Sequence, residues 1–138
     1  MANIQSINVN VQTGSDPDAD ADGAIYLGFC GREFSIDSSG DDFEKGTSKT
    51  YVFGQGSNVA NASRNDPRNP QLKTENIDKH PVYIRMGTTD HWQLKRVTVT
   101  LNGALFPMWD TAEVLGISGR FWLGPTAGMP FYIPKHDD

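Results

Sequence analysis

The sequence predicts an all-β fold, either a sandwich or a barrel, and three observations support that prediction. Apolar and polar residues alternate with a period of two through several short segments, as in strands packed on one face. The chain has 14 glycines and 8 prolines in 138 residues, many of them between these segments, which is typical of turns. None of the segments carries the 3.6-residue apolar period of a long helix. Many short strands joined by such turns indicate a sandwich or barrel.

The expected strands follow one another from the N-terminus. The first is INVNVQTG, where Ile7, Val9 and Val11 alternate with polar residues. AIYLGFCG follows, and REFSID either continues it or forms the next strand; KTYVFG and VYIRM come after them, bounded by glycine or proline. WQLKRVTVTLNG alternates again and ends in an Asn-Gly turn, and RFWLG and PFYIP are the last two.

Two regions differ from this pattern. Residues 54–71 form a long polar loop with two prolines, and we expect it to be either flexible or a binding loop. Residues 111–138 are atypical, being rich in glycine and aromatic residues, and their last five residues are expected to be frayed. We expect the aromatics here to lie mainly in the core, with one or two exposed. The length suggests a single domain, 1–138.

Charge is distributed unevenly along the chain. Residues 1–44 hold nine acids and one base, giving −8, whereas residues 45–138 hold eleven bases and eight acids, giving +3 and a net charge of −5. Nucleic acid would be repelled by the first third, so a nucleic-acid partner is excluded. No segment reaches the ~20 apolar residues of a membrane span. The first residues lack a secretory signal, so we expect a cytoplasmic protein, or an extracellular one if another route exports it.

The acids concentrate in short turns that suit calcium. The run TGSDPDADADG places Asp18, Asp20 and Asp22 at alternate positions before Gly23, as in the first half of an EF-hand loop. The twelfth position is Phe29, where an EF-hand needs glutamate, and a strand follows in place of a helix. An EF-hand is therefore excluded.

Further acids occur in two later turns. SGDDFEKG contributes Asp41, Asp42 and Glu44, and GTTDHW contributes Asp90. If the three turns meet at one end of a sandwich, these carboxylates could share calcium, because like charges brought together without a cation repel. The alternative is that each turn is simply solvated, since aspartate is common in turns. The spacing leaves both open.

Four ordered segments give the chain a family resemblance. VQTGSDPDADADGAIYLGFCG, DDFEKGTSKTYVF, DHWQLKRVTV and the later LFP resemble, in that order, the segments of a PLAT domain, the β-sandwich of lipoxygenases and pancreatic lipase. The matching positions are Thr13, Gly14, Asp22, Ile25 to Leu27, Gly31, Asp42 to Gly46, Trp92, Leu94, Val97, Phe106, Pro107 and Trp109.

The resemblance implies an eight-stranded antiparallel β-sandwich with calcium sites among the three acidic turns. Asp22, Asp41, Asp42 and Glu44 fall on ligand positions of calcium-dependent members, Asp90 falls near one, and His91 stands where some members have an acid. With the neighbouring acids of the first turn, the expected metal ligands are Asp18, Asp20, Asp22, Asp41, Asp42, Glu44 and Asp90. Membrane-binding members carry bulky aromatics in the first turn, whereas this chain has Asp16-Pro17-Asp18, which disfavours insertion.

Three functions follow as hypotheses. The first is a non-catalytic calcium-binding module that contacts a protein or a lipid surface. The second is a small enzyme or ligand-binding protein with an apolar pocket lined by Phe29, Trp92, Trp109 and Trp122, with His91 at its mouth. The third is a carbohydrate-binding module that uses the late aromatics. No nucleophile or metal-binding histidine motif occurs, and Cys30 is expected to be a buried small hydrophobe.

Overall fold

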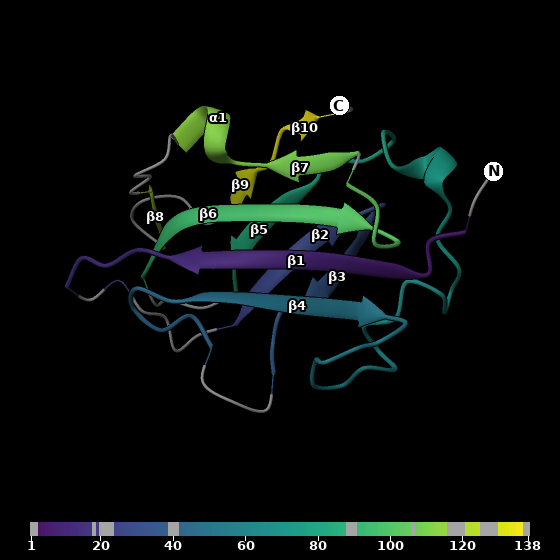
Figure 1. Ribbon diagram of the computed structural model, residues 1–138, viewed down its shortest axis with the longest axis horizontal. Coiled ribbons are helices and arrows are strands. Elements are labelled where there is room, and N and C mark those ends of the chain that lie inside the picture. The colour runs from purple at the N-terminus through teal and green to yellow at the C-terminus, as the bar shows by residue number, and fades with distance from the viewer. Residues whose placement is uncertain are drawn as a thin grey trace.

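The chain folds as two antiparallel sheets packed face to face (Figure 1). The computed structural model describes residues 3–17, 19, 24–38, 42–87, 91–105, 107–115, 121–124 and 130–136. Its strands are β1 Ser6–Thr13, β2 Ile25–Phe29, β3 Arg32–Ser35, β4 Ser48–Gly54, β5 Tyr83–Met86, β6 Trp92–Leu101, β7 Met108–Asp110, β8 Phe121–Leu123, β9 Pro130–Tyr132 and β10 Lys135–His136. A 3₁₀ turn, η1 Thr74–Asn76, and a short helix, α1 Ala112–Leu115, complete the elements. No helix in the described ranges is long and apolar enough to cross a membrane.

The predicted β-sandwich is confirmed, but the predicted number of strands is wrong. The first sheet has the order β10-β7-β6-β1-β4, with β8 also paired to β6, and the second has the order β3-β2-β5-β9. The described residues thus form ten strands where eight were expected. The additional strands are β7 and β10, which are too short to show an alternating pattern. Lys135 and His136 pair with β7, so this part of the expected frayed tail is a strand.

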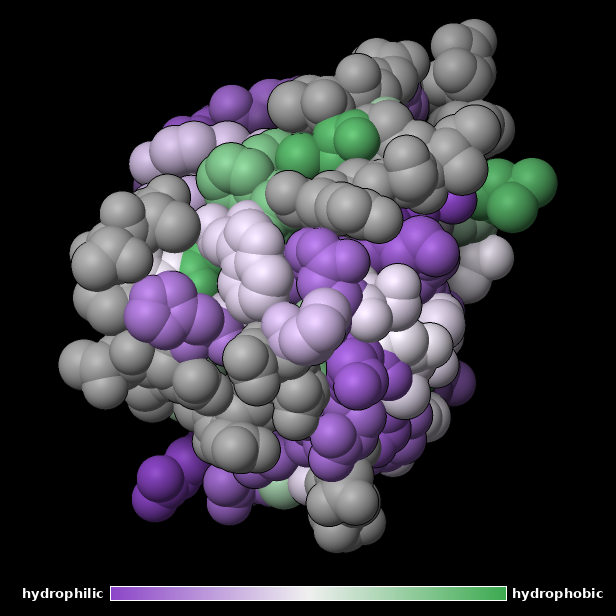
Figure 2. Space-filling model, turned by 90° about the vertical axis from the view of Figure 1, so that its left-hand side faces the viewer, coloured by the Kyte–Doolittle hydropathy of each residue, from purple (hydrophilic) through white to green (hydrophobic). Residues whose placement is uncertain are grey.

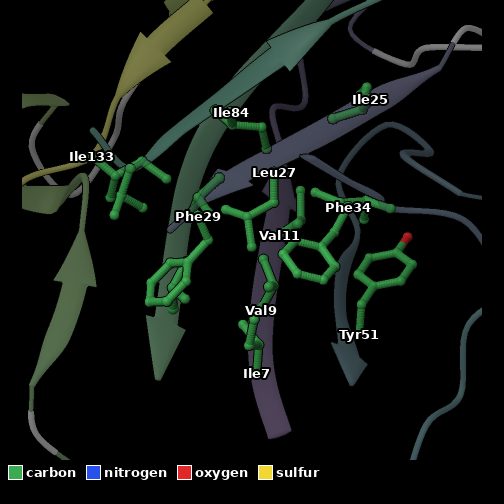
Figure 3. Close-up of a cluster of buried hydrophobic side chains, with 14 of the residues drawn as sticks. Ile7, Val9, Val11, Ile25, Leu27, Phe29, Phe34, Tyr51, Ile84 and Ile133 are labelled. Carbon is green, nitrogen blue, oxygen red and sulfur yellow. The ribbon is translucent and has the colours of Figure 1, made fainter. Parts of the chain in front are cut away.

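Alternation in the sequence does translate into a buried face and an open face. Ile7, Val9 and Val11 of β1 point inward with at most 2 % exposure, and Figure 3 shows them facing Leu27 and Phe29 of β2. The polar residues between them lie on the outer face of β1. Burial of one face of each sheet against the other supplies the core, because each sheet is apolar on only one side.

Aromatic pairs join the two sheets across this core. The Phe29 and Trp109 rings meet edge to face at 5.0 Å, joining β2 to β7, and Phe34 of β3 lies 5.4 Å from Phe53 of β4. Of the late aromatics, Trp109 is buried, Phe121 and Phe131 are partly buried, and Tyr132 is 63 % exposed. This distribution confirms the expectation of core packing with one or two exposed rings.

The long polar loop is held against the sandwich along much of its length. Asn65 is 5 % exposed, and its side chain accepts a hydrogen bond from the Ser35 N–H and donates to the carbonyls of Ala60 and Asn61. The Arg32 guanidinium donates to the carbonyls of Asp66 and Pro70. The loop therefore covers the β3 side of the molecule.

Candidate functional site at the acidic end

The strand pairing brings the three acidic turns to the same end of the molecule. β1 runs antiparallel to both β4 and β6, with Gln12 opposite Ser48 on one side and Arg96 on the other. The turn that follows β1 therefore lies between the turns that precede β4 and β6, at the left of Figure 1. Figure 2 views this end directly, where hydrophilic surface is extensive and hydrophobic surface gathers in the upper part.

Backbone hydrogen bonds join these turns to one another. The Thr13 N–H donates to the Thr47 carbonyl and the Gly46 N–H donates to the Gly14 carbonyl, both at 2.9 Å. These two bonds connect the first turn to the second. The Gly14 N–H donates to the Gln93 carbonyl at 2.9 Å, which connects the first turn to the start of β6.

Gln93 fixes the first turn with its side chain as well as its backbone. It is 1 % exposed, its Nε2 donates to the Asp16 carboxylate at 2.7 Å, and its N–H donates to the Ala19 carbonyl at 3.0 Å. A Cβ at Gly14 would lie 1.9 Å from the Gln93 Oε1, so only glycine leaves room for this amide. Gln93 was not among the predicted site residues, because an amide on a strand carries no recognisable sequence pattern.

Most of the predicted calcium ligands lie outside the described residues. These are Asp18, Asp20, Asp22, Asp41 and Asp90. The described pair, Asp42 and Glu44, both belong to the second turn. Glu44 is exposed and uses its backbone carbonyl to accept from the Thr47 N–H and hydroxyl. In the part of the chain that the structure describes, no three His, Cys, Asp or Glu side chains are grouped closely enough to hold a metal. The seven-residue ligand set therefore stays a prediction.

Asp42 lies in a polar cluster at the base of the second turn. Its Oδ1 accepts from the Tyr51 hydroxyl at 2.7 Å and from the Lys49 ammonium at 3.0 Å, and its Oδ2 accepts from the Ser38 N–H at 3.0 Å. Burial raises the pKa of this carboxyl, but hydrogen bonds from Ser38, Tyr51 and Lys49 outweigh burial and lower the pKa to about 2. Burial and the same hydrogen bond raise the pKa of the Tyr51 phenol.

A second carboxylate, Asp37, lies against Asp42. Burial, a hydrogen bond to Asp42 and the negative charge of Asp42 together raise the pKa of Asp37. Two neighbouring carboxylates repel each other when both are ionised, so the pair would bind a cation more readily than either carboxylate alone. Asp37 was not among the predicted ligands, because it is the last residue of the predicted strand REFSID and lies outside the acidic turns. Carboxylate oxygens are ligands that calcium prefers, although the Asp42 carboxylate already binds the Lys49 ammonium at 3.0 Å.

The core leaves little support for an apolar pocket between the sheets. Trp92 is fully buried, its ring meets Phe43 at 5.4 Å, and its Nε1 donates to the Thr13 hydroxyl at 3.0 Å. Phe29 packs against Trp109, so three of the four residues expected to line a pocket are in contact with other side chains. Trp122 is half-buried at the position opposite Gln93, and His91 is exposed.

Cys30 is buried in the protein, whereas His80 is exposed to solvent. Cys30 is a buried free thiol, and burial raises its pKa to about 11, which confirms the expected small hydrophobe. His80 is exposed beside the β2–β3 turn, and His136 belongs to β10.

Comparison with known proteins supports the fold. No family model and no curated protein matches the chain. Among solved structures, the chain is similar to the alpha-toxin of Clostridium perfringens from avian strain SWCP, with a TM-score of 0.64 and 22 % identity over 96 % of this chain. Alpha toxin from Clostridium absonum gives a TM-score of 0.63 at 22 % identity and also covers 96 % of the chain. A LOX variant, Delta413-417:GS I805W, gives 0.61 at 13 % identity over 95 % of the chain.

These likenesses establish a PLAT-like β-sandwich fold, as the sequence predicted. The chain spans 32 % of each toxin and 16 % of the LOX chain. It thus corresponds to a part of these larger proteins. At such identities the likeness shows the fold alone.

Proposed function

We propose that this chain is a non-catalytic, calcium-binding β-sandwich module that uses its acidic end to contact a lipid surface or a protein. One observation carries the proposal. The backbone bonds among Thr13, Gly14, Gly46, Thr47 and Gln93 hold the first acidic turn to the second and to the start of β6, the strand that follows the third acidic turn. Calcium takes six to eight oxygen ligands, so several turns that meet at one place suit it better than a single loop.

Charge gives a second line of support. The first 44 residues carry a charge of −8, and Asp37 and Asp42 already contact each other at the base of the second turn. A bound divalent cation would offset part of that repulsion and would stabilise the folded state by mass action. Asp42, which accepts hydrogen bonds from Ser38, Lys49 and Tyr51, would fix the second turn, whereas the other predicted carboxylates would bind the ion.

The kind of contact follows from the polar character of the first turn. Pro17 is exposed and Asp16 is bound to Gln93. An acidic turn of this kind lacks an apolar anchor, so calcium would bridge the module to anionic groups at a surface without insertion into hydrocarbon. Contact with an anionic lipid surface would therefore be reversible and calcium-dependent. One LOX neighbour was solved in complex with arachidonate, which agrees with a lipid-related setting for this fold.

The first experiment is a calorimetric titration of the chain with calcium, together with thermal unfolding in calcium and in EDTA. We expect heat of binding and a higher Tm in millimolar calcium, with stabilisation of about 2.7 kcal/mol at a hundredfold excess over Kd. The double variant Asp22→Asn/Asp90→Asn should lose both effects. The double variant Glu75→Gln/Asp78→Asn, with equal charge change on the 3₁₀ region, should keep them. Absence of heat and of any Tm rise in the natural sequence would remove the calcium proposal.

A second experiment tests the surface contact. Vesicles of phosphatidylserine and of phosphatidylcholine are sedimented with the chain, each in calcium and in EDTA. We expect co-sedimentation only with phosphatidylserine and only in calcium. If calcium binds but neither vesicle retains the chain, the contact is with a protein. Equal retention by both vesicles would contradict a calcium-bridged contact.

A further inference from the structure

The outer face of the second sheet carries an ordered row of side chains. Strand register places Glu33, Gly28, Tyr83 and Tyr132 in one row across β3, β2, β5 and β9. The row spans three strand spacings, about 14 Å. Tyr26 and Arg85 lie opposite each other in the neighbouring row. We call Tyr26, Tyr83, Tyr132, Glu33 and Arg85 the tyrosine platform.

Two glycines let tyrosine rings lie down on this face. A Cβ at Gly28 would come within 2.0 Å of the Tyr83 ring, and a Cβ at Gly87 would come within 2.5 Å of the Tyr26 ring. Each ring therefore occupies the space above a glycine, where any other residue would displace it. The rings form a low surface and do not stand upright as isolated side chains.

Polar atoms lie at the centre of the tyrosine platform. Glu33 accepts two hydrogen bonds from the Arg85 guanidinium, at 2.6 and 2.7 Å, and one from the Tyr83 hydroxyl at 2.6 Å. The Arg85 guanidinium also lies 4.6 Å from the centre of the Tyr26 ring. These contacts hold the Glu33 and Arg85 side chains in place, so their hydrogen-bond donors and acceptors have fixed positions. The net charge of the pair is zero.

Tyr83 and Tyr26 fill the space above the two glycines, so those glycines do not explain why Tyr132 lies on this face. This residue is 63 % exposed and its ring meets Tyr83 edge to face at 6.1 Å. The Tyr132 side chain therefore presents an aromatic ring and a hydroxyl to a partner beside the fixed, neutral ion pair. Tyrosine and arginine are also the residues enriched where binding energy concentrates.

We propose that the tyrosine platform binds a neutral oligosaccharide. Sugar rings have apolar C–H faces that pack on aromatic rings, and hydroxyls that both donate and accept hydrogen bonds. The exposed ring of Tyr132 offers a surface to such a face, and the Glu33–Arg85 pair matches neighbouring hydroxyls. The zero net charge of the pair favours a neutral ligand over a phosphate, a nucleic acid or an anionic lipid. Burial of the ion pair against an apolar partner would leave its remaining polar atoms unsatisfied.

This site is independent of the calcium proposal, and its test keeps the two apart. The full chain is titrated with cello-, xylo-, manno- and chito-oligosaccharides in EDTA, and amide chemical shifts and Kd are measured. We expect at least one sugar to shift amides of β2, β5 and β9. Tyr132→Ala should weaken that binding at least tenfold, and Glu33→Gln should also weaken it while the aromatic surface is kept. Leu105→Ala, at an 80 % exposed residue in the β6–β7 turn, should leave the Kd unchanged.

Three results would overturn the proposal. One is the absence of any shift at millimolar concentrations of all four sugars. Another is binding that Tyr132→Ala does not weaken although the variant keeps its Tm. The third is sedimentation velocity that shows a dimer of the natural chain and a monomer of Tyr132→Ala, because the platform would then be an interface with a second copy.

Discussion

At the scale of single residues, Asp37 and Asp42 share one small region but have opposite electrostatic surroundings. Asp42 is surrounded by donors from Ser38, Lys49 and Tyr51, whereas Asp37 faces the charge of Asp42. A carboxyl whose pKa is raised in the folded state binds its proton more tightly there, so its ionisation at neutral pH opposes folding. Asp37 thus reduces stability in the absence of a cation.

Replacement of Asp37 should therefore stabilise the calcium-free chain. We expect Asp37→Asn to raise the free energy of unfolding in EDTA by about 1 kcal/mol or less, because the residue is largely exposed to solvent. Urea unfolding at neutral pH measures the change, and Asp78→Asn, which breaks an exposed ion pair with Lys135, is the matched charge control. In calcium, the increase in the free energy of unfolding caused by Asp37→Asn should become smaller or turn into a decrease. A loss of stability in EDTA would show that Asp42 does not repel Asp37.

Acid should unfold the chain through Asp42 and Glu33. Hydrogen bonds from Arg85 are the main cause that lowers the pKa of Glu33, to about 2, and the pKa of Asp42 is also about 2. Lowered carboxyl pKa values give stability that is complete above their ordinary values of 4.5 and 3.8 and is lost as pH falls toward 2. For Asp42 the loss is on the order of 2 kcal/mol, partly offset by Asp37. Urea unfolding from pH 6 to 2 should show a smaller decline in Asp42→Asn than in the natural chain.

At the scale of elements, β4 is an edge strand of the first sheet, and Asn58 covers part of its open side. The Asn58 side chain accepts from the Val52 N–H at 2.8 Å and donates to the Thr50 carbonyl at 2.9 Å. The amide satisfies two backbone groups that would otherwise be open to a strand of another chain.

Loss of this amide should expose the edge. We expect Asn58→Ala to reduce the free energy of unfolding by about 1 kcal/mol, the worth of one or two exposed hydrogen bonds. We also expect greater self-association at high concentration, measured by sedimentation velocity. Gln55→Ala, at an exposed residue of the same loop, should change neither property. Unchanged association of Asn58→Ala would mean that the long loop itself protects β4.

At the scale of the whole molecule, the two sheets depend on a few aromatic contacts between them. Phe29 is 1 % exposed and packs on Trp109 of the opposite sheet. Phe29→Ala should lower the free energy of unfolding by about 3–5 kcal/mol, because it removes a buried ring and leaves a cavity. Leu105→Ala should change it by less than about 0.5 kcal/mol. Denaturant unfolding of both variants measures the difference, and similar values would contradict a continuous core at Phe29.

The fold could be predicted because apolar and polar residues alternate in the sequence wherever a strand buries one face. Ile7, Val9 and Val11 show that alternation directly, and the Asn-Gly turn after β6 is confirmed by positive φ at Asn102 and Gly103. β7 and β10 have three and two residues, too few for a period to be visible; β7 pairs with the edge of β6, and β10 pairs with β7.

The candidate sites were predictable only in part. The acidic turns are visible in the sequence, and antiparallel pairing places the strands that flank them side by side. The tyrosine platform could not be seen, because Tyr26 and Tyr83 lie far apart in the chain and meet only through the β2–β5 register. Gln93 could not be seen either, since its role depends on backbone partners at Gly14 and Ala19.

The bonds that Gln93 makes have a consequence for the entropy of binding. A free loop must lose much of its conformational freedom when several of its oxygens converge on one ion. Here the Gly14 N–H, the Ala19 carbonyl and the Asp16 carboxylate are already bonded to Gln93, the second residue of a ten-residue strand. Much of the ordering is therefore complete when the chain folds. A ligand at the acidic end would meet a turn whose base is already in place, and its affinity would depend less on the number of its contacts than on this prior restraint.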